Sequence, residues 1–311
     1  MVILARPGAI VLALLLLGLS SGCQSDDKGR RDDAPSPAAA VPEPAPQAQP
    51  KSPPAPNKPS PVDELKATAS IPQGLKCLKA AYPEHICSVS ANAIHWCDGT
   101  KMAYDDGKAH KTHAQFLEGA DLEDQMKQRY LIGTQYPEPP QDFDPGRARH
   151  EPFFKKMYGQ DAKAVSRTLV PVFWMPKTVN RRILVTGVNG IDKKLKAVSD
   201  EIEALPEPIR KMAQKTSGTF VWRTIKGTDR LSSHSFAIAV DVGVEFSDYW
   251  KWARKPAGAP LPYKNRFPLE VVEIFERHGF VWGGKWYHYD TMHFEYRPEL
   301  LADGCVLTSP P

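Results

Sequence analysis

The chain has 311 residues, of which 41% are hydrophobic and 24% are charged. This composition is ordinary for globular proteins and excludes a wholly disordered or fibrous chain, and the length suits one large domain or two small ones. Lys and Arg number 40 against 36 Asp and Glu, so the formal net charge is only +4. Such a small excess gives no indication of a nucleic-acid partner.

An apolar run near the start of the chain predicts export. It extends from Ala9 to Leu19, follows Arg6, and is too short to cross a bilayer as a helix of about 20 residues. A run of this length after a basic residue is typical of the h-region of a secretory signal. We therefore expect an exported protein.

The segment Leu-Ser-Ser-Gly-Cys over residues 19–23 resembles the lipobox of bacterial lipoproteins, in which the cysteine receives lipid after signal cleavage. Ser20 departs from the pattern, which usually has Leu at that place. The resemblance implies a lipoprotein signal peptide over residues 1–23 and a membrane anchor on Cys23, with export without lipid as the alternative. Because Gln24 and not Asp follows the cysteine, the sorting rules of lipoproteins imply the outer membrane, facing the periplasm.

A Pro-rich and Ala-rich segment follows over residues 24–64. Eleven of the 30 prolines lie between Pro35 and Pro61, where apolar side chains are almost absent. Such a segment cannot bury a core, so we expect a disordered tether. In polyproline II conformation, residues 34–62 would span about 90 Å at about 3.1 Å per residue.

Four cysteines remain beyond the predicted signal: Cys77, Cys87, Cys97 and Cys305. Two disulfides are expected in an oxidising compartment, and four cysteines allow three pairings. A bridge to Cys305 would tie the C-terminus to the segment that holds the other three. A zinc site on these thiols is disfavoured because no two of them are separated by only two to four residues.

The globular region is expected to have an N-terminal elaboration over residues 65–165 and a core over residues 166–311. Segments rich in Val, Ile and aromatic residues predict strands. These segments are 218–225, 237–246, 280–282 and 291–296. Helices and strands do not alternate regularly, so the predicted class is α+β.

Two helices are predicted within the core. Apolar side chains recur at intervals of four and three residues from Ile191 to Leu205, and Pro206 ends the pattern. A second helix is expected from Pro268 to His278. The glycine that follows it suits the left-handed conformation that ends a helix.

Two of the nine histidines stand in segments that suit metal chemistry. His234 lies among small residues that let the backbone pass close to a ligand, and His293 lies in a predicted strand. Six others stand apart from any metal-binding pattern, with no acid at metal-ligand spacing near them. We predict that these six are surface or structural residues: His85, His95, His110, His113, His150 and His278.

A catalytic zinc needs three protein ligands and one open position. His234, Asp241 and His293 would supply two nitrogens and one oxygen. A straight strand would point His234 and Asp241 to opposite faces, so His234 is expected on the turn that enters the strand. The same reasoning places Asp290 on the loop before the last strand, beside the metal, and places His293 and Glu295 on one face of that strand.

Two separated motifs then carry a family resemblance. They are S-x-H-x-x-A-x-A-x-D over residues 232–241 and D-x-x-H over residues 290–293. Both resemble the zinc D-alanyl-D-alanine carboxypeptidase (VanY-like) family, which includes D-Ala-D-Ala dipeptidases and L-alanyl-D-glutamate endopeptidases. The similarity covers about a third of the chain and leaves residues 65–166 unexplained. It implies an antiparallel sheet with flanking helices, as in hedgehog and DD-peptidase proteins.

The resemblance also implies roles for single residues. It assigns zinc to the three ligands named above and the role of general base to Asp290. A substrate-polarising arginine falls on Arg223, with Arg230 as the competing candidate, and Ser232 would bind the substrate peptide. Ala237 stands where relatives usually have Gly, and a left-handed backbone would be costly there.

The partners of the ligand histidines are a further expectation, because metal-bound imidazoles usually donate their second N–H group. Glu295, His288 and Tyr289 are the candidates. Glu295 is expected to be a structural acid, paired with an arginine, and not a ligand.

The predicted function is hydrolysis of peptide bonds in peptidoglycan stems by zinc-activated water, with Asp290 as the base. The Asp-x-x-His motif and the segment Trp-Gly-Gly-Lys-Trp over residues 282–286 look more like the L-Ala-D-Glu endopeptidase branch. A D-Ala-D-Ala carboxypeptidase is the alternative. An alternative function of a different class is that of a non-catalytic, zinc-containing lipoprotein that binds the cell wall. A third alternative is a metal-dependent hydrolase of small amides. We expect a monomer that binds stem peptides, is attached to the membrane through Cys23, and binds no nucleic acid.

Overall fold

The computed structural model describes residues 70–308. The predicted signal peptide over residues 1–23, the lipid on Cys23 and the whole of the expected tether over residues 24–64 lie outside the described residues. Within residues 70–308, no helix is both long enough and apolar enough to cross a membrane.

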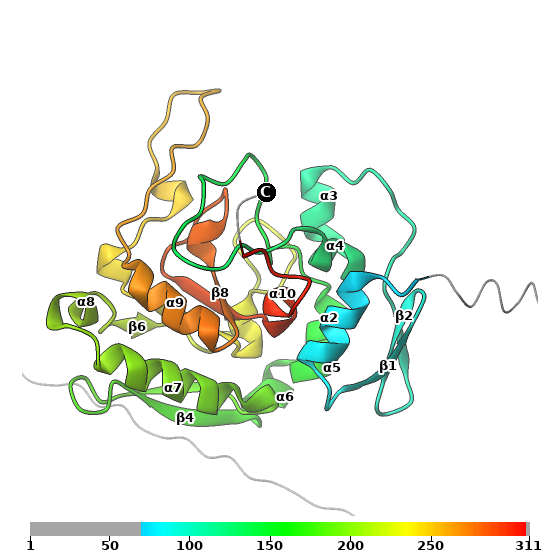
Figure 1. Cartoon of the computed structure of the whole chain (residues 1–311), viewed down its shortest axis with the longest axis horizontal. Helices are drawn as coiled ribbons and strands as arrows, with labels where there is room; N and C mark the ends of the chain where they lie inside the picture. Colours follow the sequence, from blue (N-terminus) through cyan, green and yellow to red (C-terminus); the bar gives the residue numbers. More distant parts are fainter. Residues whose placement is uncertain (1–69, 309–311) are drawn as a thin grey trace, which may run out of the picture. The chain divides into compact units, whose positions relative to one another are not determined.

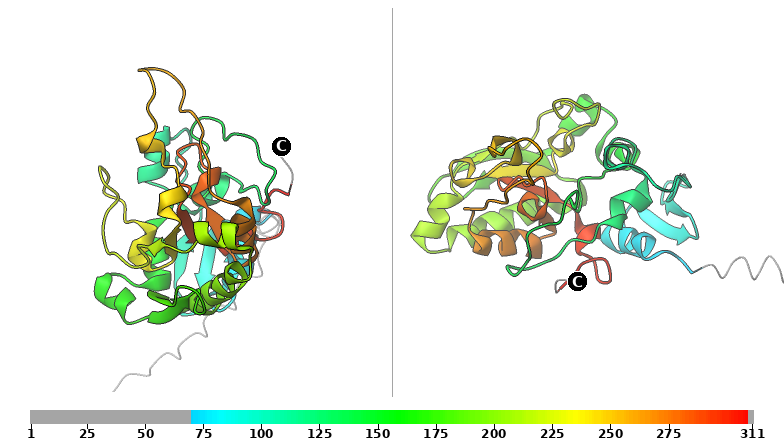
Figure 2. Two further views of the ribbon diagram at one scale, coloured as in Figure 1. Left: turned by 90° about the vertical axis from the view of Figure 1, so that its left-hand side faces the viewer. Right: turned by 90° about the horizontal axis from the view of Figure 1, so that it is seen from above.

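Helices and strands are mixed along the described chain, which confirms the predicted α+β class (Figures 1 and 2). The helices are α2 Gln73–Ala81, α3 His113–Glu118, α4 Leu122–Lys127, α5 Glu151–Tyr158, α6 Ala162–Ser166, α7 Ile191–Glu203, α8 Glu207–Met212, α9 Leu269–Arg277 and α10 Pro298–Leu301. The strands are β1 Ile86–Ser90, β2 Ala93–Trp96, β3 Lys101–Ala103, β4 Leu169–Trp174, β5 Arg181–Thr186, β6 Thr216–Ser217, β7 Ala239–Val242, β8 Phe280–Trp282 and β9 His293–Tyr296. Short 3-10 turns are η1 Val188–Gly190, η2 Ser233–Phe236, η3 Val244–Phe246, η4 Trp250–Trp252 and η5 Gly283–Lys285.

The strands form three antiparallel sheets in the described part of the chain. Strands β1, β2 and β3 pair in that order, β4 pairs with β5, and the third sheet has the order β6-β7-β9-β8. In Figure 1 the first sheet lies beside α2, whereas α7 runs along the β4–β5 hairpin and neighbours α9.

Both predicted helices of the core are present. Helix α7 buries its apolar stripe, which includes Ile191, Leu195, Val198 and Ile202, and it ends three residues before Pro206. Helix α9 begins after Pro268 and ends before Gly279, whose φ of +90° is the expected left-handed stop.

Helix α9 covers one face of the four-stranded sheet. The rings of Phe275 on α9 and Phe294 on β9 stack with their centroids 3.8 Å apart, and both side chains are fully buried. Val240 on β7 is buried on the same side of the sheet as Phe294, its cross-strand partner. The opposite face of β7 and β9 is therefore free for polar side chains.

The predicted strand over residues 218–225 is wrong. Pairing stops at Ser217 because the chain turns away at Gly218, which has a φ of +59°. Farther along, Val221 donates its N–H to the His234 carbonyl oxygen, and Thr224 makes only an isolated bridge to Leu231. This segment is a loop over the third sheet.

Two other predicted strands are longer than the observed ones. The segment 237–246 forms a strand only at β7, because the backbone is left-handed at Ala237 before it and at Gly243 after it. The segment 291–296 forms a strand from His293 onward, whereas β8 has the predicted bounds.

The N-terminal and C-terminal parts of the described chain share one hydrophobic core, which extends from Leu75 to Cys305. A buried polar cluster joins them. Glu299, after β9, accepts hydrogen bonds from Tyr82 at 2.6 Å and from Gln125 at 3.1 Å, and it pairs with Arg297 at 2.6 Å.

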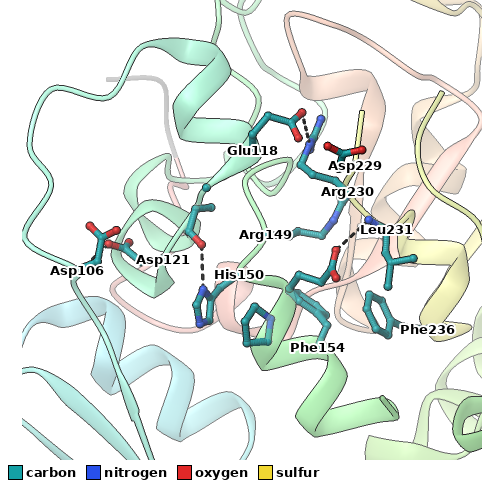
Figure 3. A pocket seen from close by; sticks show the side chains of 14 residues that line it. Asp106, Glu118, Asp121, Arg149, His150, Phe154, Asp229, Arg230, Leu231 and Phe236 are labelled. Carbon is teal, nitrogen blue, oxygen red and sulfur yellow. Dashed lines mark hydrogen bonds and ion pairs between the residues drawn. The ribbon is translucent and has the colours of Figure 1, made fainter. Parts of the chain in front are cut away.

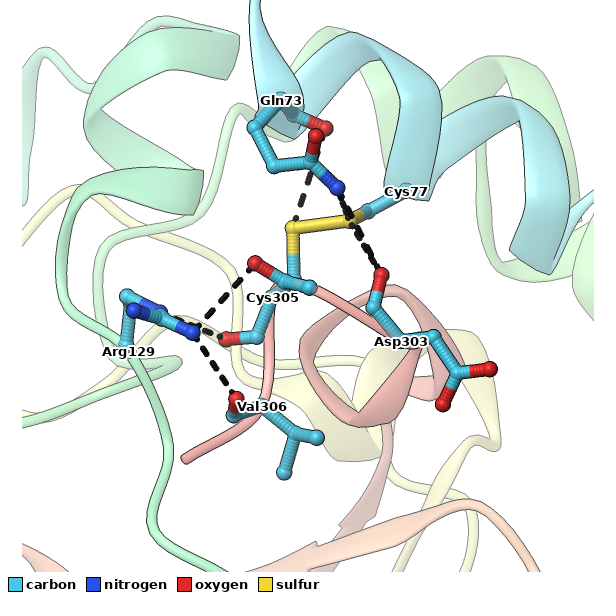
Figure 4. The surroundings of a disulfide bond; sticks show 7 residues. Gln73, Cys77, Arg129, Asp303, Cys305 and Val306 are labelled. Carbon is cyan, nitrogen blue, oxygen red and sulfur yellow. Dashed lines mark hydrogen bonds between the residues drawn. A yellow bond between two sulfur atoms is a disulfide. The ribbon is translucent and has the colours of Figure 1, made fainter. Parts of the chain in front are cut away.

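Two disulfides are present, which confirms the expectation for the four cysteines and resolves their pairing. Cys77 pairs with Cys305, and Cys87 pairs with Cys97. The first bond ties helix α2 to the C-terminal segment, as expected for a bridge to Cys305. Arg129 reinforces this junction because its guanidinium donates to the carbonyl oxygens of Gly304, Cys305 and Val306 (Figure 4).

The two disulfides should differ in their contribution to stability, because a cross-link restricts the unfolded chain more when its loop is longer. The bonded cysteines are 228 and 10 residues apart. We expect the double variant Cys77→Ser/Cys305→Ser to lose about 5 kcal/mol of unfolding free energy, and Cys87→Ser/Cys97→Ser about 3 kcal/mol. Urea unfolding of both variants measures this, and an equal or larger loss for the second pair would contradict it.

Candidate active site

The register of β7 and β9 brings two of the predicted zinc ligands together. Asp241 lies directly opposite His293, and Ala239 lies opposite Glu295. Since side chains alternate along a strand, Asp241, His293 and Glu295 all point to the face of the sheet that α9 does not cover.

His234 reaches the same place from the turn before β7. It lies in the 3-10 turn η2, as the parity of the seven-residue gap predicted. The turn ends at Ala237, whose φ of 54° and ψ of 32° are left-handed. A left-handed backbone costs a non-glycine residue about 1–2 kcal/mol. Ala237 therefore adopts the conformation described above as costly for alanine.

The donor atoms of the three side chains lie close together. The Oδ1 atom of Asp241 is 3.3 Å from Nε2 of His234 and 3.2 Å from Nδ1 of His293. Both histidines are buried, and the donor atoms of the three residues all lie within 4.8 Å of one another. The structure therefore brings the predicted triad together.

The pKa values of the triad shift in different directions. Burial alone would lower the pKa of His293, but its hydrogen bonds with Asp241 and Glu295 outweigh burial and raise it to about 10. Burial lowers the pKa of His234, which favours the neutral imidazole that a metal requires. Burial alone would raise the pKa of Asp241, but its hydrogen bonds with His234 and His293 outweigh burial and lower it. Asp241 is therefore a carboxylate between two imidazoles.

The second nitrogen of His293 has its own partners. Nε2 lies 3.4 Å from Oε2 of Glu295 and 3.3 Å from Oγ of Ser233. Glu295 is fully buried and pairs at 3.1 Å with both Arg149 and Arg297, as expected for a structural acid paired with arginine. Its carboxylate can therefore fix the orientation of the His293 ring.

Tyr289 and His288 are the other two candidate partners of the predicted ligand histidines. Tyr289 is buried with its ring against Tyr263, and among the described residues its hydroxyl makes no hydrogen bond with a ligand histidine. His288 lies at the cleft, and its Nδ1–H group donates a hydrogen bond to Oδ2 of Asp144 at 2.7 Å.

Asp290 lies in the loop before β9, as predicted, and lines the cleft with the triad. Its Oδ1 atom is buried and has no hydrogen-bond partner within the described chain. Burial raises the pKa of Asp290 to about 6. A general base is most effective when its pKa lies near the pH at which the enzyme works, so this shift suits a base.

The two candidate arginines are separated by the structure. Arg223 is exposed in the cleft of the triad, where Oγ of Ser235 accepts its backbone N–H at 3.0 Å. Arg230 lies in the neighbouring cavity and pairs with Glu118 at 3.1 Å (Figure 3). Ser232 lines the cleft beside the ligands.

Sequence reasoning missed the contribution of the N-terminal elaboration to the cleft, which consists of two lining arginines and one buried acid behind them. Arg147 and Arg149 line the cleft, and Asp144 binds both the backbone N–H and the ring of His288. Burial would raise the pKa of Asp144, but His288 and Arg147 outweigh burial and lower it. No local motif marks these residues, because they approach the site only through tertiary packing.

The donor set fits a catalytic metal. Two imidazoles and one carboxylate are typical ligands of catalytic zinc, which keeps one position open. The unpartnered Oδ1 atom of Asp290 lies at the same cleft, where an acid can act on a molecule held there. This fold and site define a candidate metallohydrolase.

Comparison with known proteins agrees with this class. Residues 226–296 match the model of a family described as D-alanyl-D-alanine carboxypeptidase, which supports the family expected from the sequence. The matched segment contains all three members of the triad and Asp290. No curated protein and no solved structure matches the chain.

Gly218 packs closely against two members of the triad. A Cβ atom there would lie 3.3 Å from Oδ2 of Asp241 and 3.6 Å from the His234 ring. We expect Gly218→Ala to raise the zinc dissociation constant about 10–100-fold, as changes next to metal ligands typically do. Competition with a chromophoric chelator measures this constant.

Gly227→Ala is the matched control for this prediction. Gly227 is also left-handed, with a φ of +84°, but a Cβ atom there would meet nothing within 4 Å. Both variants should therefore lose stability, and only Gly218→Ala should lose zinc affinity. Equal zinc affinity in the two variants would show that Gly218 does not shape the site.

Proposed function

We propose that the protein is a zinc metallopeptidase that hydrolyses peptide bonds in the stem peptides of peptidoglycan. The observation that carries this proposal is the convergence of His234, Asp241 and His293 beside the buried, unpartnered carboxylate of Asp290. A structural zinc normally has four protein ligands, whereas this site offers three ligands and a separate acid.

The chain's own residues have distinct roles in this proposal. His234, Asp241 and His293 would hold zinc, which supplies a Lewis acid that lowers the pKa of water toward ~7 and polarises a carbonyl oxygen. Asp290 takes the proton of the attacking water and passes it to the leaving amine. Arg223 stabilises the negative charge that develops on the substrate carbonyl oxygen.

The charge of the cleft supports an acidic substrate. Five cationic side chains line it: Arg147, Arg149, Arg223, Lys226 and Lys251. Stem peptides carry free carboxylates, which such a cleft attracts and which arginines bind with two parallel hydrogen bonds. Ser232 would hydrogen-bond the peptide near the cleaved bond.

The bond between L-Ala and D-Glu is the proposed site of cleavage, because the Asp-x-x-His motif and the segment Trp-Gly-Gly-Lys-Trp over residues 282–286 are similar to the endopeptidase branch. A D-Ala-D-Ala carboxypeptidase is the second candidate, which the description of the matched family favours. In either case we propose a lipid anchor on Cys23 at the outer membrane, with residues 24–64 as the tether to the wall.

Replacement of the base tests the proposed chemistry. We expect Asp290→Asn to keep its zinc content but to lose at least 100-fold of its rate on isolated peptidoglycan, because positioned bases contribute about 10²–10⁴-fold. Fragments are quantified by mass spectrometry, with a chelator-treated sample beside the native protein. Asp200→Asn, an exposed site on α7, is the matched control and should keep full activity.

Fragment masses from the same digest identify the bond. New stems that begin with D-Glu would establish the endopeptidase, and stems shortened only by D-Ala would establish the carboxypeptidase. Full activity of Asp290→Asn would refute the role of the base. A zinc-loaded native protein that releases neither fragment would refute the peptidase.

A further inference from the structure

A second group of metal-ligating side chains lies beside the cleft and shares no residue with the triad. His113 is the first residue of α3, Asp142 and Asp144 lie in the segment between α4 and α5, and His288 lies between β8 and β9. The donor atoms of His113, Asp142 and His288 all lie within 4.8 Å of one another. Asp144 adds a fourth donor, since its Oδ2 atom is 3.7 Å from Nε2 of His113 and 2.7 Å from Nδ1 of His288.

One nitrogen of this group has no partner to explain its burial. Nε2 of His113 is buried and makes no hydrogen bond within residues 70–308. It points to the two carboxylates, at 3.8 Å from Oδ1 of Asp142 and 3.7 Å from Oδ2 of Asp144. A buried polar atom without a partner is unfavourable unless a water or an ion satisfies it.

Aromatic rings pack against both imidazoles of this group. The rings of His113 and His288 stack with their centroids 5.5 Å apart, and the ring of Phe116 stacks on His113 with centroids 6.5 Å apart. The ring of Trp250 lies 4.7 Å from His288. These contacts restrict the rotation of the two rings.

The carboxylates of this group make no direct ion pair with a lysine or arginine in the described part of the chain, although the charge of Arg147 lowers the pKa of Asp144. Within the described residues, Asp142 and Asp144 form ion pairs only with histidines. The acidic residues near α4 differ, because the ammonium group of Lys111 lies among Asp106, Asp121 and Asp124. The second group already contains a cation, whereas the carboxylates of the first group contact only histidines directly.

We propose that His113, Asp142, Asp144 and His288 form a second zinc site, separate from the triad. Two imidazoles and two carboxylates are a donor set that zinc accepts. Ligand atoms around a tetrahedral zinc lie about 3.3 Å apart, given bonds of about 2.0–2.2 Å. The separations of 3.7 and 3.8 Å from Nε2 of His113 are near this value, whereas the 2.7 Å between Asp144 and His288 is a hydrogen bond that the ion would replace.

The ion would join three parts of the chain. It would fasten α3 and the segment of Asp142 and Asp144, both within the N-terminal elaboration, to the loop that continues from His288 to Asp290. This gives the elaboration a purpose at the active site, since the second zinc fixes the loop that presents the base.

Zinc content of the full chain tests the proposal. Metal is removed from the protein with a chelator, zinc is added back, and free metal is separated from the protein. The bound zinc is then quantified by inductively coupled plasma mass spectrometry. We expect two zinc ions per native chain, one in His113→Gln, one in His293→Ala and none in the variant with both changes. A native chain with one zinc, or a His113→Gln variant that keeps two, would overturn the proposal.

Two further variants guard this experiment. Asp142→Asn removes a ligand without a cost to the backbone, because Asp142 has a φ of +61° that Asn also adopts readily. It should bind one zinc at full strength and the second at least tenfold more weakly, and unchanged affinity would overturn the site. His110→Gln, an exposed histidine close by in sequence, should keep two zinc ions.

The same measurement separates this proposal from the proposed function. Loss of one zinc in His113→Gln with no loss in His293→Ala would support the second site and refute the triad. One zinc in the native chain, lost only in His293→Ala, would support the triad and refute the second site.

Discussion

The antiparallel pairing of β7 with β9 is the constraint on which the candidate site depends. Because Asp241 lies opposite His293, a carboxylate and an imidazole meet on one face of the sheet, while Val240 and Phe294 enter the core on the other. A shift of the register by one residue would reverse both faces, burying the polar pair and exposing the core pair. The packing of Phe294 on Phe275 of α9 therefore fixes the position of the ligands as well as the fold.

The N-terminal elaboration is connected to this sheet through buried charges. Arg149 pairs with Glu295, which in turn lies against His293, so a guanidinium from the elaboration helps to hold a proposed ligand. Removal of one partner of a buried ion pair typically costs about 3–5 kcal/mol, because the other charge remains buried. The disulfide from α2 to the C-terminal segment ties the same two parts covalently. The elaboration is thus part of the architecture of the site.

Residues that are close in sequence to a motif could be predicted, and residues brought by tertiary packing could not. The triad and Asp290 stand in two short motifs whose parity places them on a turn and on one face of a strand. The loop over residues 218–225 was wrongly predicted to be a strand, because the position of Gly218 against Asp241 is invisible in a list of β-favouring residues. His113 was predicted to be a surface or structural residue, because the acidic residues near it are distant in sequence. They approach it only in the folded chain.

Anomalous diffraction at the zinc edge, from crystals of the zinc-loaded protein, tests most directly whether the paired strands build a metal centre. The account predicts a strong peak bounded by Nε2 of His234, Oδ1 of Asp241 and Nδ1 of His293, at about 2.0–2.2 Å from each atom. Asp290 should approach this position without coordinating the ion. A zinc-loaded crystal with no peak between these three residues would contradict the account.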